Sequence, residues 1–307
     1  MIEHKDPNPK GQLDEFEIIV MAEDSVMYES PYLGQHGISM LARATGGGVT
    51  RHILMDVGQN PTGLLHNFRQ MNIDPACIDA IIITHCHYDH TQGLAEIVAA
   101  IGKKDLPVIA HPAMFRLNFI TAPFLRHVGV MSGDSEDKLR AAGAELYLVT
   151  DPLELMPGLF TTGEVKRQTD YEEVGIGGLA TIEDGKVKAD SMPDDMSIVA
   201  RVRGHAPIVM TGCSHAGIVN IVKQVSSMCG THEFENVMGG FHLIEASENR
   251  IKKTVAGLSE YQMKAIMPGH CTGFRAQAAM YAAFGKVFTP LQTGMRIKVS
   301  AGHQADH

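Results

Sequence analysis

Three histidines and an aspartate lie within six residues of the sequence: His85, His87, Asp89 and His90. They follow the apolar run 80–83, whose short length and branched side chains predict a buried strand. Residues two apart on a strand face the same way, so His85 and His87 can point at one place. Asp89 and His90 lie where the chain turns towards a helix and can point at a second place beside it. Imidazole and carboxylate groups together suit zinc, iron or manganese, so this stretch predicts a metal site.

A single histidine is usually a surface residue or a hydrogen-bonded core residue. Four candidate ligands at the end of an apolar strand are a different case, because burial without a metal would leave several polar groups without partners. Three more histidines, His215, His242 and His270, follow later apolar strands, each at a turn that contains glycine. Functional groups gather at the carboxyl ends of strands in α/β sheets, so we expect these histidines to converge with the first cluster.

The composition limits the class of protein. The 307 residues are 44% hydrophobic and 20% charged, which is ordinary for a soluble globular protein, and the formal net charge is −9. This acidic balance argues against nucleic acid or an anionic membrane as a partner. No apolar stretch is long enough to cross a bilayer, and the first residues lack the apolar region of a signal peptide. We therefore expect neither a nucleic acid nor a membrane as a partner, and the sequence leaves the oligomeric state open.

The cysteines bear on the redox compartment. Five of them are scattered along the chain without the spacing of a disulfide framework. An odd number without such spacing favours reduced thiols in a cytoplasmic protein.

Strands and helices alternate through most of the chain. Residues 1–14 are polar and predict a loose lead-in, and 301–307 predict a disordered tail. The acidic, glycine-containing stretch 171–195 is expected to form an exposed loop. Segment 113–143 carries mixed apolar and polar residues and is expected to fold over the mouth of the site, either as a lid or through core packing of its aromatic residues. Length alone suggests about two domains.

Taken together, these motifs resemble the metallo-β-lactamase-fold superfamily. The resemblance rests on His85-x-His87-x-Asp89-His90, the earlier Asp56-x-Gly58 turn and the later Pro268-Gly269-His270, which occur in the family's order. Longer segments narrow it to one branch, whose members are described as metal-dependent hydrolases or as dihydropterin-methyl ribofuranosylaminobenzene 5′-phosphate synthases; they include Thr211-Gly212-Cys213-Ser214-His215 and Gly239-Gly240-Phe241-His242. The resemblance implies an α/β (α+β) fold, a four-layered αβ/βα sandwich that forms one domain over residues 15–300.

The resemblance also implies a set of metal ligands. The positions that match superfamily ligands are His85, His87, Asp89, His90 and His270. They imply one or two divalent ions, with zinc as the first choice and iron or manganese as alternatives.

Two positions depart from the family pattern. Glu164 follows Gly163 where many members have Gly-His, and Cys213 follows Gly212 where they have Gly-Asp, whose aspartate bridges two metals. We expect His215 to supply a ligand, with Cys213 as the alternative because a thiolate binds zinc well. Glu164 is expected to be a ligand or a substrate contact.

The function that the resemblance implies first is hydrolysis of a small-molecule substrate of ester or phosphoester type, with a metal-activated hydroxide as the nucleophile. Asp89 would hold a metal and orient the nucleophile. His242 would donate a proton to the leaving group or contact a phosphate. Arg167, three residues after Glu164, would meet an anionic substrate, although a solvated surface arginine is an equal alternative.

A second activity is group transfer at the same metal site, in which a dihydropterin-methyl diphosphate condenses with ribofuranosylaminobenzene 5′-phosphate. Two further classes have less support from the sequence. A metal-dependent binding or sensing protein would not need so complete a ligand set. An iron redox centre is disfavoured by His87, because the diiron redox branch commonly has a carboxylate at that position.

Overall fold

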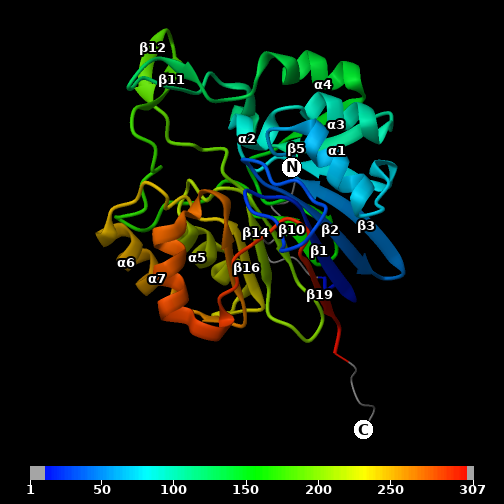
Figure 1. Ribbon diagram of the computed structural model, residues 1–307, viewed down its shortest axis with the longest axis vertical. Helices are drawn as coiled ribbons and strands as arrows, with labels where there is room; N and C mark the ends of the chain where they lie inside the picture. The colour runs from blue at the N-terminus through cyan, green and yellow to red at the C-terminus, as the bar shows by residue number, and fades with distance from the viewer. Residues whose placement is uncertain (1–10, 303–307) are drawn as a thin grey trace, which may run out of the picture.

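The computed structural model describes residues 11–302 and arranges them as two β-sheets packed face to face, with helices on both outer faces (Figure 1). This is the predicted four-layered αβ/βα sandwich. The strands of the first sheet, in spatial order, are β19 (Arg296–Ser300), β1 (Glu15–Ala22), β2 (Ser39–Gly46), β3 (Val49–Met55), β4 (Ala80–Ile82), β5 (Leu106–Ala110) and β8 (Ala144–Leu148). Those of the second are β18 (Ile266–Gly269), β16 (Asn236–Gly240), β14 (Ile208–Thr211), β13 (Ser197–Ala200), β10 (Leu159–Thr161) and β9 (Glu154–Met156).

Each sheet has an antiparallel part and a parallel part. In the first sheet, β19, β1, β2 and β3 pair antiparallel, and β3, β4, β5 and β8 are parallel. In the second sheet, β9, β10, β13 and β14 pair antiparallel, and β14, β16 and β18 are parallel. The parallel strands of each sheet therefore deliver their carboxyl ends to one edge, where the following loops can meet.

Alternating apolar residues build three core layers. On β1, Ile18 and Val20 belong to the layer between the sheets, while Ile19 and Met21 face the helices of the first half. The period of two residues makes this division possible, since successive strand side chains point to opposite faces. The helices that cover the first sheet are α1 (Pro61–Gln70), α3 (Leu94–Ile101) and α4 (Glu136–Ala142), and those that cover the second are α5 (Ile218–Cys229), α6 (Glu248–Leu258) and α7 (Phe274–Phe284). None of the helices within 11–302 is long and apolar enough to cross a membrane.

A third, smaller sheet projects beside the sandwich and is called here the arm. Its strands, in spatial order, are β12 (Lys186–Ala189), β11 (Leu179–Glu183), β6 (Phe119–Ile120) and β7 (Arg126–His127). It lies at the upper left of Figure 1, away from both main sheets. The prediction of an exposed loop over 171–195 is therefore wrong in its centre, where β11 and β12 form a hairpin. The segment 113–143 contributes β6, β7 and α4.

The two ends of the described chain are tied to the sandwich. Leu13 is fully buried, and its backbone N–H donates to Arg201 O, so the described part of the predicted lead-in is packed rather than loose. At the other end, Ala301 N–H donates to Asp14 O. The rest of the lead-in and the predicted tail, 1–10 and 303–307, lie outside the described residues.

One partly buried arginine, Arg116, links the arm to the sandwich. Arg116 donates from Nε to Asp190 Oδ2 at 2.7 Å, and its Nη2 lies 2.8 Å from Asp194 Oδ1. The other oxygen of Asp194 accepts from Cys86 N–H at 2.8 Å, within the first histidine motif. Both carboxylate side chains are 1% exposed. Because paired charges tolerate burial far better than single ones, Arg116 allows this acidic segment to pack beside the site.

We expect Arg116→Met to lower the free energy of unfolding by about 3–5 kcal/mol, because it leaves Asp190 and Asp194 as buried carboxylates without a cation. Urea denaturation of the metal-free protein measures this loss. Arg126→Met is the matched control, since Arg126 is exposed on β7 of the same arm and its replacement should change stability by less than about 0.5 kcal/mol. Equal losses in the two variants would contradict the role given to Arg116.

Candidate metal centre

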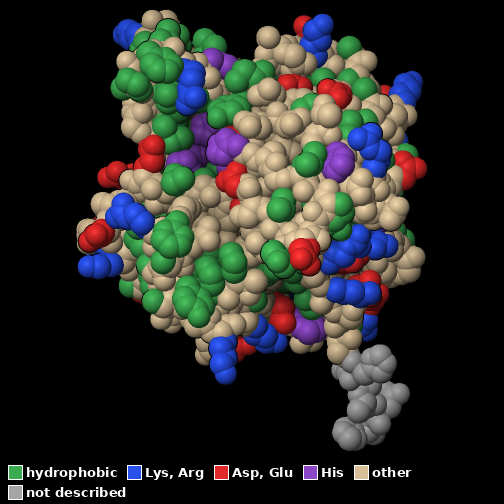
Figure 2. Space-filling model, viewed as in Figure 1, with side chains coloured by type: hydrophobic (Ala, Val, Ile, Leu, Met, Phe, Trp, Pro, Cys, Tyr) green, Lys and Arg blue, Asp and Glu red, His purple; other side chains and the backbone are tan. Residues whose placement is uncertain are grey.

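Four strand ends meet between the two main sheets. The histidine motif follows β4, Cys213 and His215 follow β14, His242 follows β16, and His270 follows β18. Figure 2 shows histidine side chains at the base of a hollow between the arm and the rest of the molecule. The convergence expected from the sequence is therefore present in the fold.

The first group of candidate ligands consists of three buried histidines, His85, His87 and His215. Their ligand atoms all lie within 4.8 Å of one another. His85 Nε2 is 3.1 Å from His87 Nδ1, and the rings of His87 and His215 are perpendicular with centroids 4.7 Å apart. The Nε2 atoms of His87 and His215 are buried and lack a hydrogen-bond partner among residues 11–302. Buried nitrogen atoms without partners, facing one another at this distance, fit a bound metal ion.

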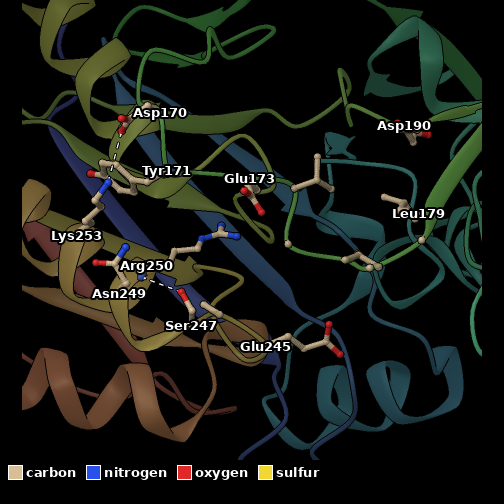
Figure 3. Close-up of a pocket in the computed structure, with 17 residues that line it drawn as sticks. Asp170, Tyr171, Glu173, Leu179, Asp190, Glu245, Ser247, Asn249, Arg250 and Lys253 are labelled. Carbon is tan, nitrogen blue, oxygen red and sulfur yellow. Dashed lines mark hydrogen bonds and ion pairs between the residues drawn. The ribbon is translucent and has the colours of Figure 1, made fainter.

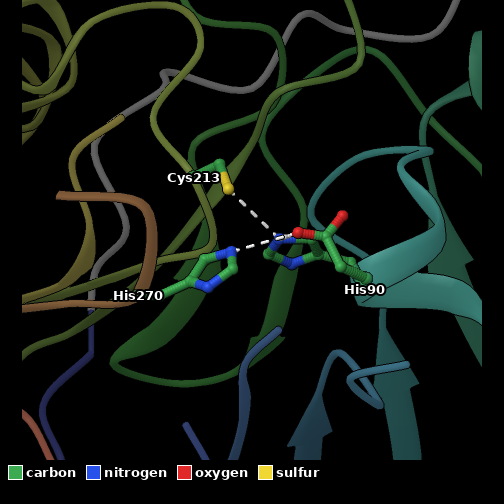
Figure 4. A group of neighbouring side chains, drawn as sticks. His90, Cys213 and His270 are labelled. Atoms are coloured by element: carbon green, nitrogen blue, oxygen red, sulfur yellow. Dashed lines mark hydrogen bonds and ion pairs between the residues drawn. The ribbon is translucent and has the colours of Figure 1, made fainter. Parts of the chain in front are cut away.

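A second group lies directly beside the first and contains Asp89, His90, Cys213 and His270 (Figure 4). His90 Nε2 is 3.2 Å from Cys213 Sγ, and His270 Nε2 is 3.2 Å from Asp89 Oδ2. Cys213 also belongs to a third group with His215 and His242. The thiol thus lies between the two places at which an ion could bind, where the family pattern implies a bridging aspartate.

Burial sets the protonation of the first group. It holds the pKa values of His85 and His215 well below the ordinary range, with further lowering by the neighbouring histidines, and it lowers the pKa of His87 to about 4. These imidazoles are therefore neutral at pH 7, which is the form that binds metals. Burial opposes the charge of Asp89, but His90 and His270 outweigh it and hold the pKa of this carboxyl well below its usual value.

Asp56 fixes the orientation of His90. It is fully buried and accepts from Thr84 N–H at 2.8 Å and Thr84 Oγ1–H at 2.7 Å, and its Oδ2 lies 2.7 Å from His90 Nδ1. A carboxylate on one ring nitrogen leaves the other nitrogen free to face the site. Gly212 makes room for this arrangement, because a Cβ at this position would lie 2.1 Å from Thr84 Oγ1.

Asp24 contacts the outer ring nitrogen of His270, and His36 contacts Asp24 in turn. Asp24 Oδ2 lies 3.1 Å from His270 Nδ1, and Asp24 Oδ1 lies 3.2 Å from His36 Nδ1. His36 Nε2 is in turn 3.4 Å from Asp89 Oδ2. The sequence interpretation missed both residues. His36 lies before β2, whereas the sequence interpretation considered histidines that follow strands.

Backbone strain occurs at the same strand ends. Four non-glycine residues of the site adopt left-handed φ angles: Asp56 (54°), Ser214 (59°), His242 (42°) and His270 (46°). Such conformations are costly for residues with a Cβ and persist where the surrounding structure enforces them, often at functional sites. These turns lie at the strand ends that carry the site residues.

Two predicted site residues lie elsewhere. The Glu164 side chain is 53% exposed, its carboxylate is 3.8 Å from His111 Nε2, and it belongs to none of the metal-capable groups found in residues 11–302. The prediction of Glu164 as a ligand is not supported, and His215 completes the first group. Arg167 is exposed and donates to the carbonyl oxygens of Glu172 at 3.3 Å and Ser191 at 2.7 Å, so these donors stabilise the base of the arm.

The remaining predicted residue, His242, lies at the edge of the centre. Its ring centroid is 4.2 Å from that of His215, and its Nδ1 is buried without a hydrogen-bond partner among the described residues. The residue itself is partly exposed. Cys271, which the sequence interpretation did not single out, places its Sγ 3.1 Å from Cys213 Sγ.

The chain is similar in sequence to known proteins. Residues 51–126 match the family described as the beta-lactamase superfamily domain. The chain is 37% identical over 290 residues to 7,8-dihydropterin-6-methyl-4-(beta-D-ribofuranosyl)-aminobenzene-5′-phosphate synthase of Methanocaldococcus jannaschii, an alignment that covers 94% of this chain and 98% of the synthase. It is 32% identical to an uncharacterized protein of the same organism, over 84% of this chain and 92% of that protein.

Solved structures show the same fold. A metal-dependent hydrolase of the beta-lactamase superfamily, Tm1679, superposes with a TM-score of 0.77 at 24% identity, covering 93% of this chain and 99% of that chain. The metallo-beta-lactamase fold protein YhfI of Bacillus subtilis superposes with a TM-score of 0.56 at 13% identity, over 93% of this chain and 100% of that chain.

We expect His215→Ala to lose bound metal during dialysis and Glu164→Ala to keep it, because His215 lies within a ligand group and Glu164 does not. Metal content after expression in zinc-supplemented medium, measured by inductively coupled plasma mass spectrometry, checks this. Circular dichroism establishes that both variants are folded. Retention of metal by His215→Ala together with loss by Glu164→Ala would reverse the assignment.

In the metal-free protein we expect the free energy of unfolding to fall as the pH drops from about 6.5 to about 4. The folded state holds the pKa of His87 at about 4, against an ordinary value of 6.5, so the unfolded state binds more protons in this window and stability rises with pH. Denaturant titrations of chelated protein across these pH values measure the slope. His87→Gln should make the slope shallower, and an unchanged slope would contradict this origin.

Proposed function

The chain belongs to the metallo-β-lactamase superfamily, and from this premise we propose that it is a metal-dependent transferase that condenses a dihydropterin-methyl diphosphate with ribofuranosylaminobenzene 5′-phosphate. The observation that carries the proposal is the similarity to the synthase of Methanocaldococcus jannaschii, which extends over 98% of that protein. The buried groups of histidine, aspartate and cysteine support it, because they fit a metal centre.

The proposed centre divides the ligands between two positions. His85, His87 and His215 would hold an ion at the first, and Asp89, His90, His270 and the shared Cys213 would hold one at the second. Imidazole and thiolate groups favour zinc, with iron as an alternative, while the carboxylate also admits manganese. One or two such ions, when bound, would supply the positive charge that neutralises a departing diphosphate.

The proposed reaction exchanges one bond for another. The amine nitrogen forms a bond to the methylene carbon of the pterin, the bond from that carbon to the diphosphate oxygen breaks with its electron pair on the oxygen, and the nitrogen loses one proton. His242 is suited to accept this proton, because the residue is partly exposed and its Nδ1 is unpartnered among residues 11–302. Asp89 would orient the reacting groups from within the second ligand group.

Hydrolysis, the first function expected from the sequence, is the second candidate. If water replaced the amine, the same bond would break and the products would be the hydroxymethyl pterin and diphosphate. Asp89 favours this possibility, because its carboxylate lies among the candidate ligands and could orient a water molecule. The solved hydrolase Tm1679 supports only the fold, since it is 24% identical to this chain.

The proposed partners and location follow from this chemistry. Both proposed substrates are small anions, and neither requires a nucleic acid or a membrane. Cys213, Cys86 and Cys271 are buried free thiols at or near the centre, which suits the reducing cytoplasm predicted from the sequence.

We expect the zinc-loaded protein to form the coupled pterin product and diphosphate from the two substrates, as detected by liquid chromatography and mass spectrometry. Chelation should abolish the reaction and restored zinc should recover it. Glu164→Ala should remain active, whereas His85→Ala should not.

The same assay separates the two candidate functions. Hydroxymethyl pterin and diphosphate, released at equal rates with and without the amine, would assign hydrolysis. The absence of both products with zinc, iron and manganese would exclude both candidates for this substrate, and a panel of phosphodiesters, lactones and thioesters would then test the broader hydrolase prediction.

A further inference from the structure

A cavity of about 770 Å³ lies beside the metal centre, under the arm. Its wall is formed by the segment 170–179, the end of β12 and the first turns of α6 (Figure 3). Its lining includes two cations, Arg250 and Lys253, and four carboxylates, Asp170, Glu173, Asp190 and Glu245. A hollow of this size can hold a ligand of several tens of atoms, so the partners of each charged group indicate what kind of ligand it suits.

Arg250 is the unusual member of this set. It is 9% exposed, yet its guanidinium has no hydrogen bond and no carboxylate within 4.0 Å among residues 11–302. Its Nε is buried without a partner. A guanidinium carries five N–H donors and no acceptor, and burying its Nε–H without a partner is costly. Glu172 and Glu173 contribute only at longer range, and burial lowers the pKa of Arg250 against their effect.

The other arginines near the site show how such a group is normally satisfied. Arg116 is paired with Asp190 and Asp194, and Arg167 donates to two carbonyl oxygens. Lys253, also in the cavity wall, has its Nζ 3.9 Å from Asp170. Arg250 therefore stands out as a cation whose acceptor is absent from the described chain. An anionic group of a ligand would satisfy it.

The position of Arg250 connects the cavity to the metal centre. Gly175 separates the two, since a Cβ at this residue would lie 2.8 Å from His242 Cδ2 and 3.1 Å from Arg250 Nη1. A ligand held by Arg250 would thus extend past Gly175 towards His242. The φ of Gly175 is +87°, so a larger residue would be strained there as well as crowded.

The carboxylates of the cavity restrict the ligand further. Asp190 is engaged by Arg116, and Asp170 faces Lys253, but Glu173 and Glu245 have no ion pair among the described residues. Figure 3 shows Arg250 extending from α6 towards Glu173, with Glu245 on the other side of the cavity. One unpaired cation with two unpaired carboxylates suits a ligand that has a single anionic group and several hydroxyl donors. A ligand with several adjacent phosphates would be repelled by these carboxylates.

We propose that this cavity is a sugar-phosphate subsite, in which Arg250 binds the phosphate and the carboxylates of Glu173 and Glu245 accept hydrogen bonds from sugar hydroxyls. The inference rests on the proposed function, within which it assigns the ribose phosphate of the amine substrate to the cavity and leaves the pterin diphosphate to the metal centre. The geometry directs the aryl amine towards His242, the residue proposed to take its proton.

The test uses ribose 5-phosphate, with ribose as the uncharged comparison, in isothermal titration calorimetry of the metal-free protein. Wild type should bind ribose 5-phosphate more tightly than ribose. Arg250→Met should weaken binding of ribose 5-phosphate by about 10- to 100-fold, as expected for loss of hydrogen bonds to a charged group. Arg250→Lys should retain part of the affinity. Lys252→Met is the matched control, because Lys252 is exposed on the same helix, and it should bind like wild type.

Equal affinity of wild type and Arg250→Met for ribose 5-phosphate would overturn the proposal, and so would equal affinity of wild type for the sugar with and without its phosphate. If the Arg250 variants fail to fold, modification of arginine side chains in the wild-type protein by phenylglyoxal tests the proposal instead. Ribose 5-phosphate should protect Arg250, identified by peptide mass spectrometry, and full modification in its presence would overturn the proposal.

The outcome is separable from that of the proposed reaction. In the coupling assay, Arg250→Met should raise the KM for the amine substrate with little change in kcat, because the lost contact lies away from the reacting atoms. If Arg250→Met coupled the two substrates with an unchanged KM, the proposed subsite would be rejected and the proposed reaction would be retained. If ribose 5-phosphate bound in an Arg250-dependent way but the protein did not couple the two substrates, the proposed subsite would be retained and the proposed reaction would be rejected.

Discussion

The structure depends on the burial of many metal-binding side chains at one end of two packed sheets. Histidines such as His85, His87 and His215 sit against one another with little exposure, and burial keeps them neutral. Neutral imidazoles at these distances do not repel, but they leave nitrogen atoms without partners. The fold tolerates these unpartnered nitrogen atoms because strands of both sheets hold the backbone in place. A bound ion would also coordinate the unpartnered nitrogen atoms. Stability and ligand capacity are therefore linked at the same atoms.

Polar groups behind the candidate ligands fix the orientation of the histidine rings. Asp56 and Asp24 contact the ring nitrogens of His90 and His270 that face away from the centre. Each comes from a loop that follows a strand of the first sheet, whereas His270 comes from the second. The two halves of the chain are thus joined by hydrogen bonds as well as by the shared apolar layer. Small residues such as Gly212 are required where these loops approach one another.

The sequence was informative where ligand type, spacing and strand ends coincide. The motif from His85 to His90 and the later His215 and His270 were placed correctly near one another, and the sandwich followed from the resemblance. Glu164 stands at the sequence position of a family ligand, but its side chain is 53% exposed and lies outside the ligand groups of residues 11–302, because alignment with a family pattern does not fix where a side chain lies in the fold. Arg250 was missed for a different reason. An arginine on an amphipathic helix looks like a surface residue, and its lack of partners is visible only in three dimensions.

The arm illustrates how a feature outside the core can be varied independently. Its hairpin is fastened at the base by Arg116, while all four residues of β12 are exposed. At the tip, Gly185 has open space around the position of a Cβ. Loop tips of this kind accept insertions that a core would reject. The turn between β11 and β12 is therefore a suitable attachment point for a fluorescent label, which would report on the surroundings of the arm without altering the metal-binding centre.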